Sequence, residues 1–279
     1  MRGSNVHRAA VAALSCSLVG LVGGCSGHEG GADRWVPDAP APSVLGDGAR
    51  LDQINDPARP RPSLTAKLDV TGVVVTARDD FDETGDGKSV GNLYVQDAVA
   101  APLPYGGIEV YGPGFSPPDL KIAAGDVVDV RGALYEEFAG PASFPFPAGE
   151  TLPELASGTV GLRFEWRAPV ARSAGFDAAG VARPILVDLA SYATGRRWLG
   201  MLVKLEDVTV ASTTASSGRF SATLSGSSVT VTNSLAPIDT FGAAGAPIAG
   251  GTHFASVTGV VMYFAGFSVA PRGASDLVP

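Results

Sequence analysis

Alternating hydrophobic and polar residues dominate the chain after about residue 50 and predict β-strands. Residues 68–75 alternate and then become continuously apolar with β-branched side chains, which suit a pleated, partly buried strand. Clusters of Gly, Pro and Asp that mark turns separate three further candidates, residues 92–97, 107–111 and 126–134. Residues 160–166 follow a proline-rich stretch and are expected to complete a small five-stranded barrel.

The second half of the chain repeats this rhythm. No stretch has helical periodicity longer than a turn or two. Five further strands are predicted, at residues 201–211, 219–224, 228–235, 252–264 and 267–271.

The repeat is also visible in the letters themselves. GDVVDVRGALYEEF, residues 125–138, aligns with GTHFASVTGVVMYF, residues 251–264, when one residue is inserted. Each segment carries an internal glycine, Gly132 or Gly259, and such a glycine marks a bulge or bend of the kind that closes a small barrel. We therefore predict an all-β protein with two tandem five-stranded barrels; one larger β-sandwich is the alternative.

The N-terminus has the pattern of an export signal. Arg2 and Arg8 precede an apolar run over residues 9–22 that ends in small residues before Cys25. The run is shorter than the ~20 residues that a membrane-spanning helix needs. We expect residues 1–24 to be a signal peptide that is removed.

The VGGC sequence at residues 22–25 resembles the lipobox of bacterial lipoproteins, an aliphatic residue and two small ones before cysteine. The resemblance implies lipidation of Cys25 and a membrane as partner. Cys16 is the rival acceptor, but Ala13 stands where the aliphatic residue belongs. Ser26 is not the aspartate that favours inner-membrane retention in enteric bacteria, so we expect an exported outer-membrane lipoprotein.

Residues 26–50 are rich in Gly, Pro, Ala, Asp and Ser and lack the apolar surface needed to order a chain. The predicted layout is a signal peptide at 1–24, the lipidated cysteine and tether at 25–50, a first barrel at 51–170, a linker at 171–190 and a second barrel at 191–279.

The cysteine content and the net charge of the chain argue against some classes of protein. Both cysteines lie at the front, so the mature body can form no internal disulfide. Without the two arginines of the signal, 18 basic residues stand against 28 acidic ones, a net charge of −10. Nucleic-acid binders show a basic footprint, so this balance argues against DNA or RNA as partner. No cofactor motif is found.

A family resemblance supports the barrels. Short motifs in both halves resemble the OB-fold domains of bacterial exported proteins, including those appended to extracellular nucleases. These motifs are VTGVVVTA (70–77), NLYVQD (92–97), GIEVYG (107–112) and GDVVDVRG (125–132), followed by GMLVKLEDVTV (200–210) and APRGASDL (270–277). The resemblance covers most of residues 51–279 and implies the OB-fold. It does not imply a particular function, because such domains often accompany a catalytic domain and none is recognised here.

An acidic stretch with Asp80, Asp82 and Asp86 invites comparison with a calcium loop. Counting twelve positions from Asp80 reaches Gly91, and counting from Asp82 reaches Leu93, so neither register supplies the bidentate glutamate. We expect a solvated hairpin tip and no metal site, with a calcium loop of another kind as the alternative.

Catalytic groups are scarce. His253 is the only histidine expected in the folded part, and a serine, zinc or metal-assisted hydrolase needs several convergent groups. Asp97, Glu109, Glu136 and Glu137 could in principle approach one another as a glycosidase pair. The sequence predicts that the protein is not an enzyme, and a cation-dependent hydrolase of nucleic acid or glycan is the alternative.

Tyr94, Tyr105 and Tyr111 fall on the second and third strands or beside them, the surface that OB-folds present to oligonucleotides and oligosaccharides. Exposed aromatic rings there would stack on bases or sugars, although strand alternation turns some of them inward.

Arg196, Arg197 and Trp198 form a second candidate, for anionic lipid, phosphate or polysaccharide; a salt bridge to the first barrel explains them as well. The sequence thus predicts a cell-envelope lipoprotein that acts as a non-catalytic binding or scaffolding module. An envelope protein or a polysaccharide is the expected partner, and a binder of extracellular DNA or polysaccharide is a further alternative.

Two separate barrels predict a specific result in limited proteolysis. Cleavage should fall in the Gly-, Ala- and Pro-rich stretch at residues 167–184 and release two resistant fragments, because exposed linkers are cut before folded domains. Mass spectrometry identifies the fragments. A single indivisible core would instead indicate the larger sandwich.

Overall fold

The computed structural model describes residues 48–279 except 88–90, 100–101, 115–121, 141–145, 147–149, 157–162, 167–185, 243–244 and 265. The predicted signal peptide, Cys25, the tether up to residue 47 and residues 171–185 of the predicted linker therefore lie outside the described residues. The described residues all belong to one compact unit.

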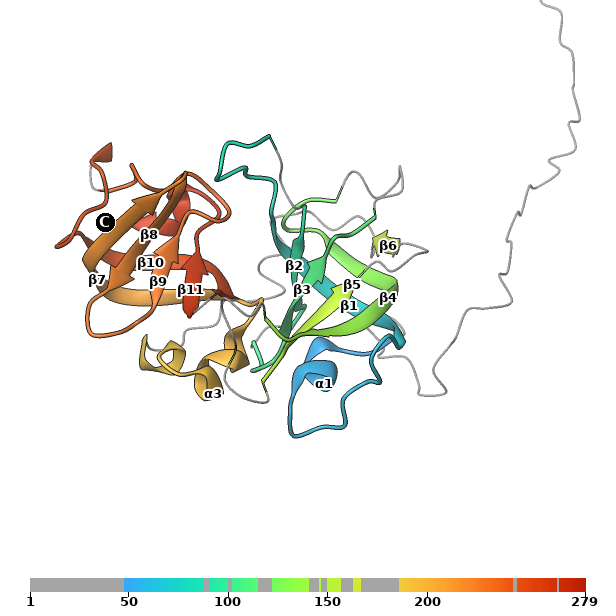
Figure 1. Ribbon diagram of the computed structural model, residues 1–279. Coiled ribbons are helices and arrows are strands. Elements are labelled where there is room, and N and C mark those ends of the chain that lie inside the picture. Colours follow the sequence, from blue (N-terminus) through green and yellow to red (C-terminus); the bar gives the residue numbers. More distant parts are fainter. Residues whose placement is uncertain are drawn as a thin grey trace, which may run out of the picture. The chain divides into compact units, whose positions relative to one another are not determined.

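Five strands of the first half close into a barrel (Figure 1). β1 pairs with β2, β2 with β3, β3 with β5, β5 with β4, and β4 returns to β1; β3 and β5 are parallel and the other pairs are antiparallel. The strands are β1 (Lys67–Arg78), β2 (Leu93–Asp97), β3 (Gly107–Tyr111), β4 (Val127–Phe138) and β5 (Leu152–Ala156).

The fifth strand of this barrel corrects the sequence prediction. β5, with the sequence LPELA, completes the ring, whereas the described part of predicted strand 160–166 is β6 (Arg163–Trp166), which pairs only with β4 outside it. Pro153 hid β5, because proline has no N–H to donate and its presence argues against a strand.

Two long strands bend around the barrel. The first half of β1 pairs with β4 and its second half with β2, with register shifts along both pairings. Gly72 and Gly132 adopt positive φ angles of 58° and 71° within β1 and β4. Both angles lie in the left-handed region, which glycine occupies at little cost. The predicted bend at Gly132 is thereby confirmed, whereas Gly259 pairs with Val203 in regular register and has no positive φ, so the bend predicted there is not found.

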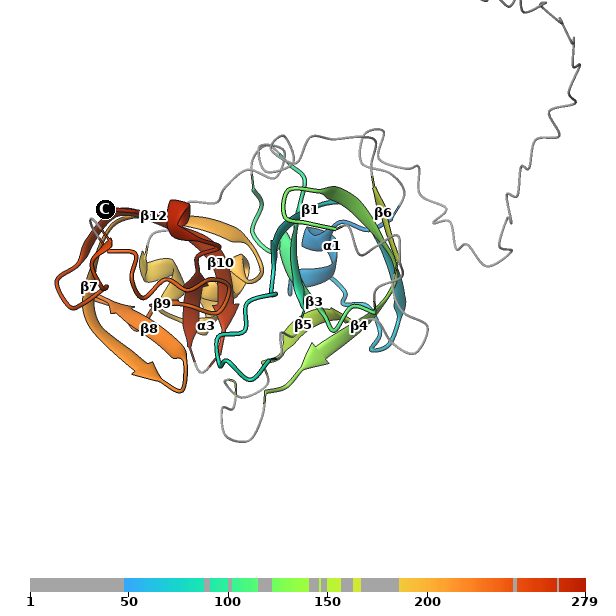
Figure 2. The ribbon, with the colours of Figure 1, turned by 90° about the horizontal axis from the view of Figure 1, so that it is seen from above.

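The short helix α1 (Leu51–Asn55) precedes β1 and lies across the opening of the barrel in Figure 2. It contacts β2 and β3, and its Leu51 and Ile54 are buried in the core of the barrel. The carboxylate of Asp97, at the end of β2, accepts hydrogen bonds from the Leu51 N–H (2.9 Å) and the Asp52 N–H (3.1 Å). Asp97 thus fixes the start of the helix and does not line the cleft that holds the other candidate carboxyl groups.

The second half forms a sheet with the same strand order. β7 pairs with β8, β8 with β9, β9 with β11, β11 with β10, and β10 returns to β7, again with the third and fifth strands parallel. β12 (Leu277–Val278) pairs with β10 outside this ring. The strands are β7 (Leu202–Ser216), β8 (Arg219–Leu224), β9 (Thr230–Thr232), β10 (His253–Tyr263) and β11 (Phe267–Ala270).

The all-β prediction is confirmed for the described residues. Their helical elements are single turns, namely α1, η2 (Leu186–Leu189), α3 (Tyr192–Gly195), η3 (Arg196–Trp198) and η5 (Ala274–Asp276). The two aligned sequence segments form β4 and β10, the fourth strand of each ring. No helix in the described part of the chain is long and apolar enough to cross a membrane.

Backbones of the two sheets meet where β3 passes the start of β7. A Cβ atom on Gly107 would lie 2.5 Å from Met201 Cγ, and one on Gly200, whose φ is +69°, would lie 2.6 Å from Ile108 N. The Leu202 N–H donates a buried hydrogen bond to Gln96 Oε1 (2.9 Å). We infer that this glycine contact fixes how closely the two sheets pack.

Gly107→Ala should lower the free energy of unfolding by about 2 kcal/mol, because the new methyl group has no room against Met201. Gly266→Ala is the matched control, since a Cβ there meets no atom within 4 Å, and it should change stability by less than about 0.5 kcal/mol. Urea denaturation of both variants measures the difference. Equal stabilities would show that the close approach is unimportant.

Candidate functional site

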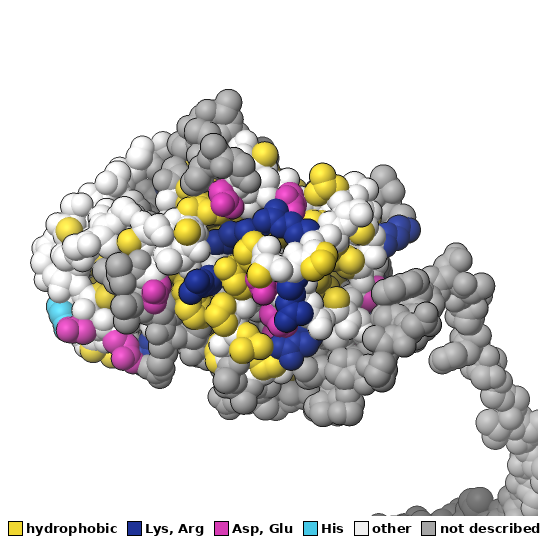
Figure 3. Space-filling view, turned by 90° about the horizontal axis from the view of Figure 1, so that it is seen from below, with side chains coloured by type: hydrophobic (Ala, Val, Ile, Leu, Met, Phe, Trp, Pro, Cys, Tyr) yellow, Lys and Arg dark blue, Asp and Glu magenta, His cyan; other side chains and the backbone are white. Residues whose placement is uncertain are grey.

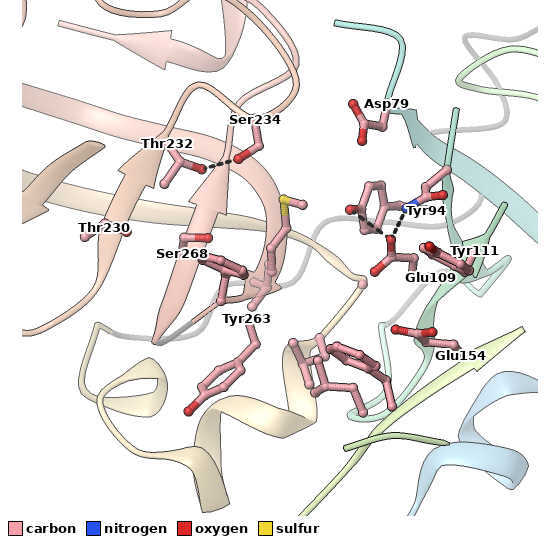
Figure 4. Close-up of a pocket in the computed structure, with 18 of the residues that line it drawn as sticks. Asp79, Tyr94, Glu109, Tyr111, Glu154, Thr230, Thr232, Ser234, Tyr263 and Ser268 are labelled. Carbon is pink, nitrogen blue, oxygen red and sulfur yellow. Dashed lines mark hydrogen bonds between the residues drawn. The ribbon is translucent and has the colours of Figure 1, made fainter. Parts of the chain in front are cut away.

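A cleft with a cavity volume of about 1130 Å³ lies between strands β2 to β5 on one side and strands β7 to β11 on the other (Figure 4). Its acidic wall comes from the first sheet and its hydroxyl wall from the second. A volume of this size suits a small organic ligand or a segment of a polymer.

The acidic wall is a row of side chains on neighbouring strands. Tyr94 on β2 stands opposite Glu109 on β3, Glu109 opposite Glu154 on β5, and Glu154 opposite Glu136 on β4. Residues directly opposite one another project from the same face of a sheet. Figure 4 shows the carboxyl groups of Glu109 and Glu154 directed into the cleft, with Asp79 nearby.

Glu109 is held in place by two neighbours from β2 or its start. The Asn92 side-chain N–H donates to Glu109 Oε1 (2.5 Å), and the hydroxyl of the buried Tyr94 donates to the same oxygen (3.5 Å). Asn92 is itself fixed, because its Oδ1 accepts a hydrogen bond from the Gly112 N–H (2.9 Å). The carboxyl group of Glu109 therefore has a defined position in the wall.

Burial and mutual repulsion make these carboxyl groups hold their protons to unusually high pH. Burial, with repulsion by Asp79, raises the pKa of Glu109 to about 7. Burial, followed by the charges of Glu109 and Glu136, raises the pKa of Glu154 to about 8. Burial beside Glu83 and Asp80 raises the pKa of Asp79 to about 6. The wall thus carries both neutral and charged carboxyl groups near neutral pH.

The hydroxyl wall is formed by small polar side chains of the second sheet. Ser221 stands opposite Thr232 and Ser268 opposite Thr230, so neighbouring strands place hydroxyl groups side by side. Thr232 and Ser234 also hydrogen-bond to each other (3.1 Å). Hydroxyl groups can both donate and accept hydrogen bonds, so this wall suits a polar ligand of either character.

Aromatic rings border the cleft. Tyr111 is 50% exposed, Phe138 45% and Phe264 60%, which is unusual for such large apolar side chains. Tyr263 is held by edge-to-face contacts with Tyr192 (5.1 Å between ring centroids) and Phe267 (4.9 Å). The exposed rings offer flat surfaces on which a ligand can stack.

The loop after β1 meets the turn between β7 and β8 at the edge of the cleft. A Cβ on Gly218 would collide with the carbonyl oxygen of Glu83, and Arg219 Nε lies 3.5 Å from Glu83 Oε1. Glu83 and Arg219 also line the cavity. This second contact between the two walls uses other residues than the contact at Gly107 and Gly200.

The structure brings two of the three candidate tyrosines to the cleft. Tyr94 and Tyr111 line it, but Tyr94 is buried and only Tyr111 offers an exposed ring. Tyr105 does not line the cleft. It has a φ of +67°, and its N–H donates to the Arg197 carbonyl oxygen (2.7 Å).

Arg196, Arg197 and Trp198 form η3 and do not line the cleft either. Arg196 is buried 3.9 Å from Glu150, Trp198 packs on the core of the second sheet, and Arg197 is exposed. Figure 3 shows Lys and Arg side chains gathered near the centre of one face with Asp and Glu side chains beside them. Because acidic and basic side chains are mixed on this face, it is not the uniformly basic surface that would attract an anionic lipid or a phosphate.

The acidic loop holds itself together with its own carboxylate. Asp82 accepts hydrogen bonds from the N–H groups of Gly85 (2.8 Å) and Gly87 (2.6 Å), and Asp80 lies 3.3 Å from Arg78. Asp86 is exposed, with its N–H directed to Asp82 (3.2 Å). Among the described residues, no group of three or more His, Cys, Asp or Glu is placed to hold a metal ion.

Sequence reasoning found Glu109 and Glu136 but missed Glu154, and it considered Asp79 only as the first residue of the acidic stretch compared with a calcium loop. Glu137, also considered there, lines the cleft as well, and its carboxylate accepts hydrogen bonds from Tyr135, Thr151 and Arg61. Glu154 was missed because the segment LPELA was not predicted as a strand. In the structure this segment is β5, and Glu154 lines the cleft beside Glu109. A scan against protein-family models and a search of curated proteins found no match to this chain.

Glu109→Gln should stabilise the protein at high pH only. The folded pKa of about 7 exceeds the ordinary value of 4.5, so wild-type stability falls as pH rises from about 5 to 8, whereas glutamine stays neutral. The stability gained by the variant should grow by about 2 kcal/mol between pH 5 and pH 8. Urea unfolding at both values measures it. A gain independent of pH would contradict the burial of this carboxyl group.

Proposed function

We propose that this chain is an exported lipoprotein, anchored through Cys25, whose two barrels form a non-catalytic binding module with its ligand in the cleft. The anchor is supported by the lipobox resemblance at residues 22–25. In this proposal the lipid places the barrels at the outer membrane, and the tether separates them from its surface; it ends before Ala49, which pairs with Val70 of the first barrel.

We further propose that both barrels are OB-folds. Support comes from the ring of five strands in each sheet and from the identical strand order, which matches the repeat in the sequence. OB-folds bind ligands on the face of their second and third strands. In the first barrel those strands are β2 and β3, which carry Tyr94, Glu109 and Tyr111 at the cleft, with Asn92 just before β2.

The cleft is the single observation that carries the binding function. It joins exposed aromatic rings, hydroxyl groups and fixed carboxyl groups in one cavity, and these groups recognise ligands rather than stabilise a fold. Hydrolysis of a glycan is the second candidate, because Glu109 and Glu154 stand on adjacent strands and can still donate protons near neutral pH.

A bulky residue in the hydroxyl wall should block binding. Thr230→Trp would fill the cavity from β9, and we expect at least a tenfold loss of affinity for any oligosaccharide or single-stranded DNA that binds the wild type. Thr213→Trp is the matched control, because Thr213 is exposed on β7 and does not line the cleft. A solution screen by fluorescence anisotropy measures both, with thermal melting to check folding.

The same screen separates binding from catalysis. Chromatography of each oligosaccharide and DNA after incubation with calcium or magnesium should recover it intact. Shortened products that disappear in Glu154→Gln would show that the protein is a hydrolase. Equal affinities of the wild type and Thr230→Trp would show that the ligand lies elsewhere.

Cys25→Ser should release the protein from membranes, because serine has no thiol to carry lipid. We expect the wild type in the outer-membrane fraction and labelled by a fatty-acid analogue, and the variant unlabelled. Cys16→Ser is the control and should behave as wild type. Membrane association and labelling that survive Cys25→Ser would refute this anchor.

A further inference from the structure

The acidic wall of the cleft contains three glutamates without a basic partner among the described residues, whereas Glu137, which also lines the cleft, pairs with Arg61 (2.9 Å). Among the described residues, no lysine or arginine forms an ion pair with Glu109, Glu136 or Glu154, and the only basic side chain lining the cavity, Arg219, lies against Glu83. Structural carboxylates elsewhere in the first barrel do have arginine partners, as Asp129 and Asp69 have Arg131. Within the described part of the chain, Glu109, Glu136 and Glu154 therefore lack the ion pairs that hold Asp69 and Asp129 in the same barrel.

Repulsion within this row can be relieved by a positive group from outside. Glu154 stands between Glu109 and Glu136 on the neighbouring strands, and Asp79 lies near Glu109 from the end of β1. A cation between them would favour the charged carboxylates and release their protons. Tyr94, which also faces Glu109, stays neutral because burial raises its pKa well above the ordinary value.

The rest of the cleft favours an organic cation over a bare metal ion. The cavity volume of about 1130 Å³ is far larger than the coordination shell of one ion, and the described residues form no metal-binding group. The exposed rings of Tyr111, Phe138 and Phe264 attract ammonium groups through their π faces. The hydroxyl wall can accept the remaining N–H or O–H groups of such a ligand.

We propose that the cleft selects ligands that carry protonated amines, such as a polyamine or an amino sugar, and that an ammonium group binds between Glu109 and Glu154. This inference rests on the proposed binding function of the cleft. It narrows the ligands of the cleft to cationic amines, because neutral sugars and nucleic acids carry no positive group to balance the charges of Glu109 and Glu154.

Titration calorimetry on the full-length protein in detergent tests this selectivity. The probes are spermine, a glucosamine tetramer and an N-acetylglucosamine tetramer, the last matching the second in rings and hydroxyl groups but lacking its charges. At least one amine probe should bind, and at least tenfold more tightly than the acetylated tetramer. Binding of one amine but not the other identifies the polyamine or the amino sugar as the better mimic.

The carboxyl groups should control this binding. Glu109→Gln and Glu154→Gln should each weaken the amine probe at least tenfold at pH 7, while Glu206→Gln, an exposed glutamate of β7 outside the cleft, should not. The affinity of spermine should rise from pH 5.5 to pH 7.5, since Asp79 and Glu109 ionise in this interval and spermine stays charged.

Three results would overturn the inference. Equal affinities for the acetylated and free tetramers, or unchanged affinity in both glutamine variants, would show that charge is not recognised. Failure of both amines to bind at millimolar concentration would do the same. If the acetylated tetramer then binds and Thr230→Trp blocks it, the proposed function of the cleft stands and only its amine selectivity fails.

Discussion

The close contact of two glycines is the constraint on which the rest of the structure depends. Gly107 on β3 and Gly200 before β7 lack side chains, so the second sheet can approach the strands of the first that carry Glu109. Any Cβ at either position would collide with the opposite backbone or with Met201. This approach turns an ordinary outer barrel face into one wall of a cleft.

The chemistry of the cleft follows from that approach. The face of β2, β3 and β5 would be solvated in an isolated barrel, and its carboxyl groups would titrate normally. Burial is the largest cause of both raised pKa values; the charge of Asp79 adds to it at Glu109, and the charges of Glu109 and Glu136 add to it at Glu154. The raised pKa values of the cleft thus come mainly from the burial of ordinary glutamates, and a cationic ligand could neutralise their negative charges.

Sequence patterns predicted the strands well and the site only in part. Alternation and short apolar runs located β1 to β4 and β7 to β11, because clusters of turn residues separate these segments in the sequence. It missed β5, where Pro153 breaks the pattern. Glu109 and Glu154 are 45 positions apart, and only the parallel pairing of β3 with β5 brings them together. The packing of the second sheet against the first could not be predicted, because the contact between Gly107 and Gly200 produces no periodic pattern in the sequence.

The most direct test is an NMR titration of the side-chain carboxyl carbons of Glu109 and Glu154 in the ligand-free protein. The account predicts midpoints of about 7 and about 8, with each resonance sensitive to the ionisation of the other. Midpoints near the ordinary 4.5 for both would mean that the row is solvated, and would contradict a cleft closed by the glycine contact.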